Sequence, residues 1–176
     1  MSFAPYRSFT FVAALVGLGL LGATPVMAQT TQTITAQATV TDACAFGTSS
    51  ATLNFGSLVS GAVPVEETSS INLDCNPNAP WTVSAAVGAG AGETVANRLL
   101  AGTGTNTDTV AWELFQDGTC TAAWGETAGT GGNVMAGTGT GAVQNMPICG
   151  EITGGAVPNV AADVYSETVT ITLNFT

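Results

Sequence analysis

Residues 165–175 read YSETVTITLNF, and this stretch decides the predicted fold. Apolar side chains alternate along it with polar ones, and the apolar set is Tyr165, Val169, Ile171, Leu173 and Phe175. A two-residue period is typical of a half-buried β-strand, because successive side chains point to opposite faces of a sheet. We expect a C-terminal strand that runs to Thr176 and whose outer edge nothing in the chain covers.

The same alternation recurs in four earlier segments. Their apolar positions are Ile34, Ala36, Ala38 and Val40; Ile71, Leu73 and Cys75; Trp81, Val83, Ala85 and Val87; and Val110, Trp112 and Leu114. Gly-rich stretches at 88–92, 102–108 and 129–141 separate these segments and are typical of turns. No sustained 3.6-residue period follows the first 28 residues, so we predict an all-β antiparallel sandwich.

The first 28 residues have the order of a secretory signal peptide. Arg7 precedes a mainly apolar run at 9–21, and the small-residue cleavage site VMA at 26–28 comes directly before Gln29. The run is too short to span a bilayer comfortably, and no later apolar stretch reaches about 18 residues. We therefore expect an exported protein, first periplasmic and then at the cell surface or in an extracellular fibre, with no membrane span in its mature form.

Composition excludes several classes of function. Removal of Arg7 leaves Arg98 as the one cation against 12 acidic residues, too little positive charge to neutralise a row of phosphates. The chain has no His and no Lys to activate its many hydroxyl groups, and no spacing of Asp, Asn and Gly matches a calcium loop. We predict no nucleic-acid binding, no enzyme activity, no metal and no cofactor.

Four cysteines remain in the mature chain: Cys44, Cys75, Cys120 and Cys149. In an exported chain an even number indicates two disulfides, for which three pairings are open. The spacing includes no short pair of the kind that binds zinc. Sequential pairing would close two separate loops, and each would contribute roughly 3–4 kcal/mol in the chain-entropy treatment.

The N-terminal segment at 29–41 is a second unusual feature. It is rich in Thr, Gln and Ala and carries only small or medium apolar side chains on one face. A long unpaired strand edge in an exported protein is normally an aggregation hazard. One end of this chain thus offers a strand, and the other end lacks one.

Short motifs occur in a characteristic order along nearly the whole mature chain. They are CAF at 44–46, LNFG at 53–56, INLDCN at 71–76, RLL at 98–100, WELFQD at 112–117, WG at 124–125, ICGEI at 148–152 and the C-terminal stretch at 165–175. Each motif is weak alone, but their order, spacing and terminal placement are specific together. The chain resembles the spore coat protein U domain family, which includes the subunits of archaic chaperone–usher pili.

The resemblance implies an incomplete immunoglobulin-like sandwich at 42–176 that lacks its last strand, which leaves a groove beside the C-terminal strand. A periplasmic chaperone would fill this groove first. The segment at 29–41 of the next identical or related subunit would then replace the chaperone as donor strand, during secretion through an outer-membrane usher. The implied function is that of a structural subunit of a pilus, fimbria or coat, active in cell adhesion or biofilm formation, which polymerises head-to-tail.

The resemblance also implies roles for individual residues. The donor side chains would be Ile34, Ala36, Ala38 and Val40, a face on which two positions are only Ala. The acceptor groove would be lined by Tyr165, Val169, Ile171, Leu173 and Phe175. The first disulfide would join Cys44 to Cys75.

Other interpretations stay open at this point. The C-terminal alternation would also fit a complete sandwich in which the segment at 29–41 folds back onto its own chain. Trp124 lies among turn residues, and an exposed Trp124 would suit a monomeric secreted carbohydrate-binding module. Arg98 is expected to pair with an acid that the sequence does not identify.

Overall fold

The computed structural model describes residues 29–47, 50–59, 64–129, 132–153 and 160–176. The predicted signal peptide lies outside these residues. The chain divides into two units, Met1–Ala38 and Thr39–Thr176, and every described strand lies in the second. The described residues form no helix, so the all-β prediction is confirmed. For the same reason this part of the chain has no helix able to cross a membrane.

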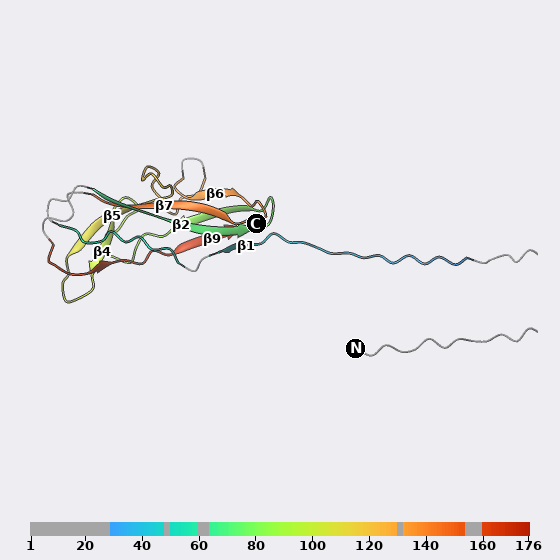
Figure 1. Ribbon diagram of the computed structural model, residues 1–176, viewed down its shortest axis with the longest axis horizontal. Helices are drawn as coiled ribbons and strands as arrows, with labels where there is room; N and C mark the ends of the chain where they lie inside the picture. Colours follow the sequence, from blue (N-terminus) through green and yellow to red (C-terminus); the bar gives the residue numbers. More distant parts are fainter. Residues whose placement is uncertain (1–28, 48–49, 60–63, 130–131, 154–159) are drawn as a thin grey trace, which may run out of the picture. The chain divides into compact units, whose positions relative to one another are not determined.

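Two antiparallel sheets build the second unit (Figure 1). The larger sheet has the order β1-β2-β7-β5-β4-β8, and the smaller has the order β6-β3-β9. The strands are β1 Cys44–Phe46, β2 Val65–Cys75, β3 Pro80–Ala85, β4 Arg98–Gly102, β5 Thr109–Phe115, β6 Met135–Thr138, β7 Gln144–Ile152, β8 Tyr165–Ser166 and β9 Ile171–Phe175.

One hydrophobic core lies between the two sheets and contains side chains from both. In β3 the buried residues are Trp81, Val83 and Ala85, and in β5 they include Val110, Trp112 and Leu114. The alternation predicted from the sequence is therefore the alternation of burial in these strands. Val87, the last position of the predicted third segment, is half-buried and follows β3.

The long antiparallel pair of β2 and β7 sets the register of the larger sheet, from Val65 opposite Ile152 to Leu73 opposite Gln144. The predicted apolar positions Ile71, Leu73 and Cys75 are all buried at the end of β2. Beyond this pair, β1 continues the sheet, with Cys44 opposite Cys75.

Two disulfides cross-link the sandwich. Cys44 is bonded to Cys75 at a sequence separation of 31, and Cys120 is bonded to Cys149 at a sequence separation of 29. This is the sequential pairing, in which each bond closes its own loop. The first disulfide ties β1 to the end of β2, and the second ties the loop after β5 to β7.

The prediction of one continuous C-terminal strand is wrong. Tyr165 and Ser166 form β8, which pairs with β4 in the larger sheet, whereas Ile171–Phe175 form β9, which pairs with β3 in the smaller sheet. The chain therefore changes sheets between residues 167 and 170. Each half keeps an inward-facing apolar side, which explains why the alternation alone resembled a single strand.

The half-buried strand that alternation predicts at 34–40 is not formed. Residues 29–43 belong to no strand, and Ile34 and Val40 are 93% and 86% exposed. A two-residue period requires a sheet on one side to bury its apolar face, and this segment has no strand partner among the described residues.

Candidate functional site: an apolar groove beside the C-terminal strands

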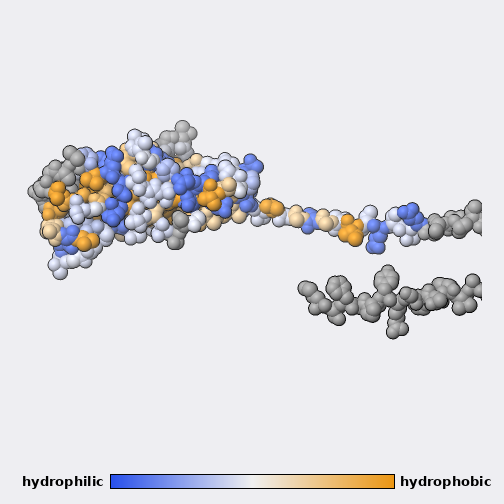
Figure 2. Space-filling model, in the orientation of Figure 1, coloured by the Kyte–Doolittle hydropathy of each residue, from blue (hydrophilic) through white to orange (hydrophobic). Residues whose placement is uncertain are grey.

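A groove of about 1150 Å³ opens into the side of the sandwich. Its floor consists of apolar core side chains from the larger sheet, which are Ile71, Leu100, Val110, Trp112, Leu114, Ile148 and Ile152. Residues 50–58 form one bank and residues 160–169, with Ile171 of β9, form the other. Figure 2 shows apolar surface, in orange, at the end of the domain that holds β4 and β5.

Among the described residues, no further strand closes either bank. Residues 50–59 lie in no strand, although Ala51, Leu53, Phe55 and Leu58 pack against the core. On the opposite bank, β8 is the last strand of its sheet, and β9 is the last strand of the smaller sheet. Backbone N–H and C=O groups on a sheet edge need partners, so an extended segment placed in this groove would find both apolar floor and free backbone.

The five residues predicted to line a groove fall into two places. Tyr165, Val169 and Ile171 line the groove described above and are half-buried. Leu173 pairs with Val83 and packs against the core, and Phe175 lies beside Trp81 in a separate hollow of about 160 Å³. Phe175 remains 42% exposed.

The bank formed by residues 50–58 was not predicted from the sequence. Leu53 and Phe55 alternate with polar residues in the motif at 53–56, which is the signal that could have identified them. The Phe55 ring meets Trp112 edge to face, with ring centroids 6.0 Å apart. Gly150 of β7 permits this approach, because a Cβ there would lie 2.8 Å from Phe55 Cζ and 2.9 Å from Leu53 Cδ1.

Polar contacts of Tyr165 hold the bank formed by residues 160–169. The Tyr165 hydroxyl donates to the Ala161 carbonyl at 2.6 Å and accepts from Asn106 Nδ2 at 2.6 Å. The Ala161 N–H in turn donates to Asp108 at 2.8 Å. These bonds attach the bank to the loop between β4 and β5, so its position is fixed even though no further strand pairs with it.

A pair of carboxyl groups lies where the chain changes sheets. Glu167 Oε2 accepts from the Trp112 indole N–H at 2.5 Å. A Cβ placed on Gly88 would lie 1.3 Å from Glu167 Oε1 and 2.1 Å from Glu93 Oε2, so these two oxygens are within hydrogen-bond distance of each other. Both are buried and have no other partner. A second carboxyl group this close disfavours the ionised form of Glu167.

Burial is the main cause that raises the pKa of Glu167 above its ordinary value. The Trp112 hydrogen bond and the charge of Arg98 favour the ionised form, whereas the neighbouring Glu93 opposes it. The net effect is that Glu167 binds its proton more tightly than an isolated Glu does.

Arg98 does not form the ion pair expected from the sequence. Its side chain is fully buried at the start of β4, and its guanidinium donates to the backbone carbonyls of Ala86, Trp124 at 3.1 Å and, at the limit of 3.5 Å, Ala85. No carboxylate of the described residues is in ion-pair contact with it. Burial lowers the pKa of Arg98, and the acids Glu167, Glu93 and Glu126 oppose this from a distance.

Trp124 is buried and not exposed, which corrects the expectation behind a carbohydrate-binding role. Its indole N–H donates to the Val83 carbonyl at 3.0 Å, and its backbone N–H donates to the Leu114 carbonyl at 2.8 Å. The turn residues around Trp124 made it look like a loop residue, but these bonds turn its ring into the core.

Comparison with known proteins identifies the family. Residues 30–172 match the profile of the Spore Coat Protein U domain. The chain belongs to this family. No curated protein matches the sequence.

Among solved structures, this chain is similar to a chain in the CsuC–CsuE complex, described as a chaperone–tip adhesion subunit pre-assembly complex from archaic chaperone–usher Csu pili of Acinetobacter baumannii. The TM-score is 0.54 at 20% sequence identity. The match covers 78% of this chain but only 41% of that chain. At this identity the likeness establishes the fold.

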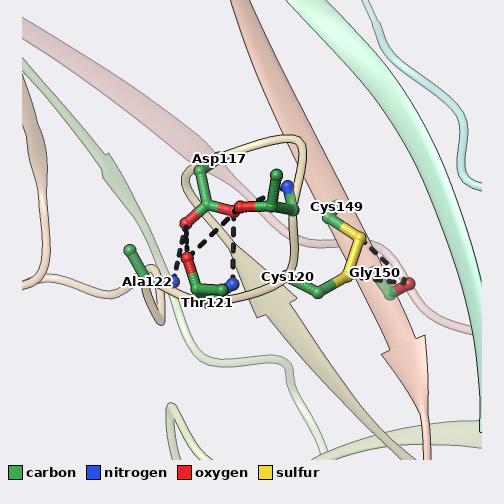
Figure 3. The surroundings of a disulfide bond; sticks show 7 residues. Asp117, Cys120, Thr121, Ala122, Cys149 and Gly150 are labelled. Atoms are coloured by element: carbon green, nitrogen blue, oxygen red, sulfur yellow. Dashed lines mark hydrogen bonds between the residues drawn. A yellow bond between two sulfur atoms is a disulfide. The ribbon is translucent and has the colours of Figure 1, made fainter.

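A second polar cluster in this chain holds the loop of the second disulfide (Figure 3). Asp117 accepts hydrogen bonds from the backbone N–H groups of Thr119, Thr121 and Ala122 and from the hydroxyls of both threonines, at 2.6–3.2 Å. Burial opposes ionisation here, but these bonds outweigh it and hold the pKa of Asp117 well below its usual range. They fix a loop in which Cys120 has φ 53°.

Glu66 of β2 lies close to the sulfur atoms of Cys120, which is in this loop, and Cys149. Both sulfur atoms are bonded to each other, so neither offers the thiolate that a metal would require. This cluster is therefore structural.

Proposed function

We propose that this chain is an exported structural subunit of a surface pilus, fimbria or coat, which polymerises by donor-strand exchange after chaperone–usher secretion. The observation that carries the proposal is the groove of about 1150 Å³, with an apolar floor and two banks that no strand of the described chain closes. In this interpretation the sandwich at 42–176 is incomplete, and the groove is the place of its missing strand.

The proposed occupant is the segment at 29–41 of another copy or of a related subunit. Ile34, Ala36, Ala38 and Val40 have the two-residue period of a strand with one apolar face, and both large members of this face are exposed in the free chain. Seating the segment would bury this face on the groove floor and supply the backbone partners that β8 and β9 lack. Burial of Ile34 alone is worth roughly 1.5–3 kcal/mol.

Because the donor and the groove are different surfaces, each copy can both give and receive a strand. Such a contact is head-to-tail and generates a filament unless its rotation closes a ring. Before assembly the same groove would expose apolar surface in the periplasm, which is the reason to expect a chaperone as its first occupant and an usher as the site of exchange. The family match and the chaperone complex of the Csu pilus protein support a chaperone as a partner.

The alternative function, a monomeric carbohydrate-binding module, is disfavoured because the residue expected to contact the sugar, Trp124, is buried. A sugar platform requires an exposed aromatic ring, and Trp124 is fully buried. The proposed role as a structural subunit also requires no enzyme activity and no cofactor.

The test is polymer formation by the mature chain, purified from a bacterial periplasm and scored as an SDS-resistant ladder without boiling. Ile34→Asp should abolish the ladder, because it places an unpartnered charge in an apolar pocket. Thr35→Asp, the matched control on the opposite face, should leave the ladder intact. Equal ladders from the two variants would contradict the donor-face assignment.

Deletion of residues 29–38 provides the second arm. The shortened domain should still bind its chaperone through the groove but should not extend a polymer. An unchanged ladder after this deletion would exclude strand exchange through the N-terminal segment.

A further inference from the structure

The chain leaves the sandwich through a short segment, Thr41–Ala43, that is held although it lies in no strand. The Asn76 backbone N–H donates to the Ala43 carbonyl at 3.0 Å, which continues the β1–β2 ladder by one step beyond the pair of Cys44 and Cys75. The Asn76 side chain then donates from Nδ2 to the Thr41 carbonyl at 2.9 Å. One residue thus holds two carbonyls of the exit segment.

Asn76 itself is fixed by the turn that follows it. The Ala79 N–H donates to the Asn76 carbonyl at 3.2 Å, Pro77 occupies the second position of the turn, and Asn78 has φ 67° in the third. These are the features of a type II β-turn, whose third position favours Gly or Asn. The turn therefore cannot swing freely with the exit segment.

The neighbouring loop packs directly on this turn. A Cβ on Gly139 would lie 2.1 Å from the Asn76 carbonyl oxygen and 2.7 Å from Cys75 Cβ, so only Gly allows the approach. Gly139 also exchanges backbone hydrogen bonds with Asn78 and Ala79, at 2.8 Å each. With the Cys44–Cys75 disulfide beside it, Asn76 is a rigid point at the place where the donor segment meets the domain.

We propose that Asn76 is a positioning residue for donor-strand exchange, which fixes the exit segment so that the donor ends at Val40. This inference rests on the proposed function. In a polymer, a donor strand seated in one subunit would be joined to its own domain by only Thr41–Ala43. By holding two carbonyls of this joint, Asn76 would fix the angle between successive subunits.

The first experiment measures the joint in single chains, by backbone ¹⁵N NMR order parameters of the mature chain in an Ile34→Asp background that prevents donor insertion. With Asn76 present, Thr41, Asp42 and Ala43 should have order parameters near the rigid value of about 0.85, and residues before Val40 should fall below about 0.6. Asn76→Ala should lower the values at 41–43 toward those of the free segment. It should also speed hydrogen exchange at the residue-76 amide by about two- to tenfold, as expected for one lost hydrogen bond.

The matched control is Asn78→Gly, which keeps a residue tolerant of positive φ in the turn and removes no bond to the exit segment. It should leave the order parameters at 41–43 unchanged. Mobile residues at 41–43 with Asn76 present, or equal values with and without the Asn76 side chain, would overturn the proposal.

The second experiment measures polymers by electron microscopy. Asn76→Ala should keep the unboiled ladder, because the donor face and groove are untouched, but should widen the distribution of angles between successive subunits. Equal distributions in the wild type and Asn76→Ala would refute the role of Asn76 alone. A wild-type chain that forms no ladder while its joint is rigid would instead refute the proposed function alone.

Discussion

Arg98→Met tests the claim that Arg98, the one cation of the described residues, stabilises the core through backbone carbonyls. The guanidinium has two firm partners, the carbonyls of Ala86 and Trp124, and a marginal one at Ala85. Hydrogen bonds to charged groups contribute about 1.5–3 kcal/mol each, so loss of the two firm bonds costs roughly 3–6 kcal/mol. These bonds join β4 to the end of β3 and to the segment at Trp124.

An opposing effect must be subtracted. Burial lowers the pKa of Arg98, which means that the folded protein holds this charge at a cost, and its Nε atom is buried without a partner. Replacing a buried charge by an apolar side chain relieves that cost. Met cannot donate to the carbonyls left behind, however, and buried backbone groups without partners are costly. We therefore expect a net loss of about 3 kcal/mol, a large share of the 5–15 kcal/mol typical of a domain.

The assay is equilibrium unfolding of residues 29–176 in urea, followed by the fluorescence of the three Trp residues. Arg98→Lys is the matched control, because an ammonium keeps the charge and can reach one carbonyl, so its loss should be about half as large. A free energy of unfolding for Arg98→Met within about 1 kcal/mol of the wild type, with an unchanged urea dependence, would refute the reasoning.

Three further predictions concern the acids and the disulfides. Because burial raises the pKa of Glu167, its contribution to stability should be complete below the ordinary Glu pKa of 4.5 and lost as pH rises through the folded value. Glu167→Gln should therefore flatten the fall in unfolding free energy as pH rises above 4.5, and equal slopes in the wild type and the variant would contradict the raised pKa. Asp117→Ala should cost about 1–2 kcal/mol in urea unfolding, as for the loss of a capping side chain, with Asp117→Asn closer to the wild type. A peptide map should join Cys44 to Cys75 and Cys120 to Cys149 with no free thiol, and Cys75→Ser should sharply reduce periplasmic yield, because roughly 3–4 kcal/mol is lost; a Cys44–Cys120 link would overturn this pairing.

Strand positions could be predicted where burial is decided locally. Alternation identified β3 and β5 and the buried end of β2, because one face of each strand packs against the core and the other lies nearer to water. It failed at the C-terminus, where the predicted strand divides into β8 and β9. The sequence did carry a signal of this division: the inward position between Tyr165 and Val169 is Glu167, the one charged residue on that face.

The interior contacts of Arg98 and Trp124 could not be predicted in the same way. Arg98 bonds to carbonyls 12 and 26 residues away, and Trp124 bonds to a carbonyl 41 residues away. Backbone carbonyls occur at every residue, so no pattern of side chains marks which ones an Arg or a Trp will reach. The expectation of an acidic partner for Arg98 used only side-chain charge and therefore missed them.

The distribution of charge limits the forces that can join two copies of this domain. All 12 acids lie at or after Asp42, and the segment at 29–41 has no charged residue. Two copies of the domain repel each other, because each carries 12 acids and only one Arg. Physiological salt screens this repulsion beyond about 8 Å. An uncharged donor adds nothing to this repulsion when it enters a groove whose floor is apolar. The attraction in the proposed assembly must therefore come from apolar burial and backbone hydrogen bonds, and salt, which weakens the repulsion, favours rather than opposes it.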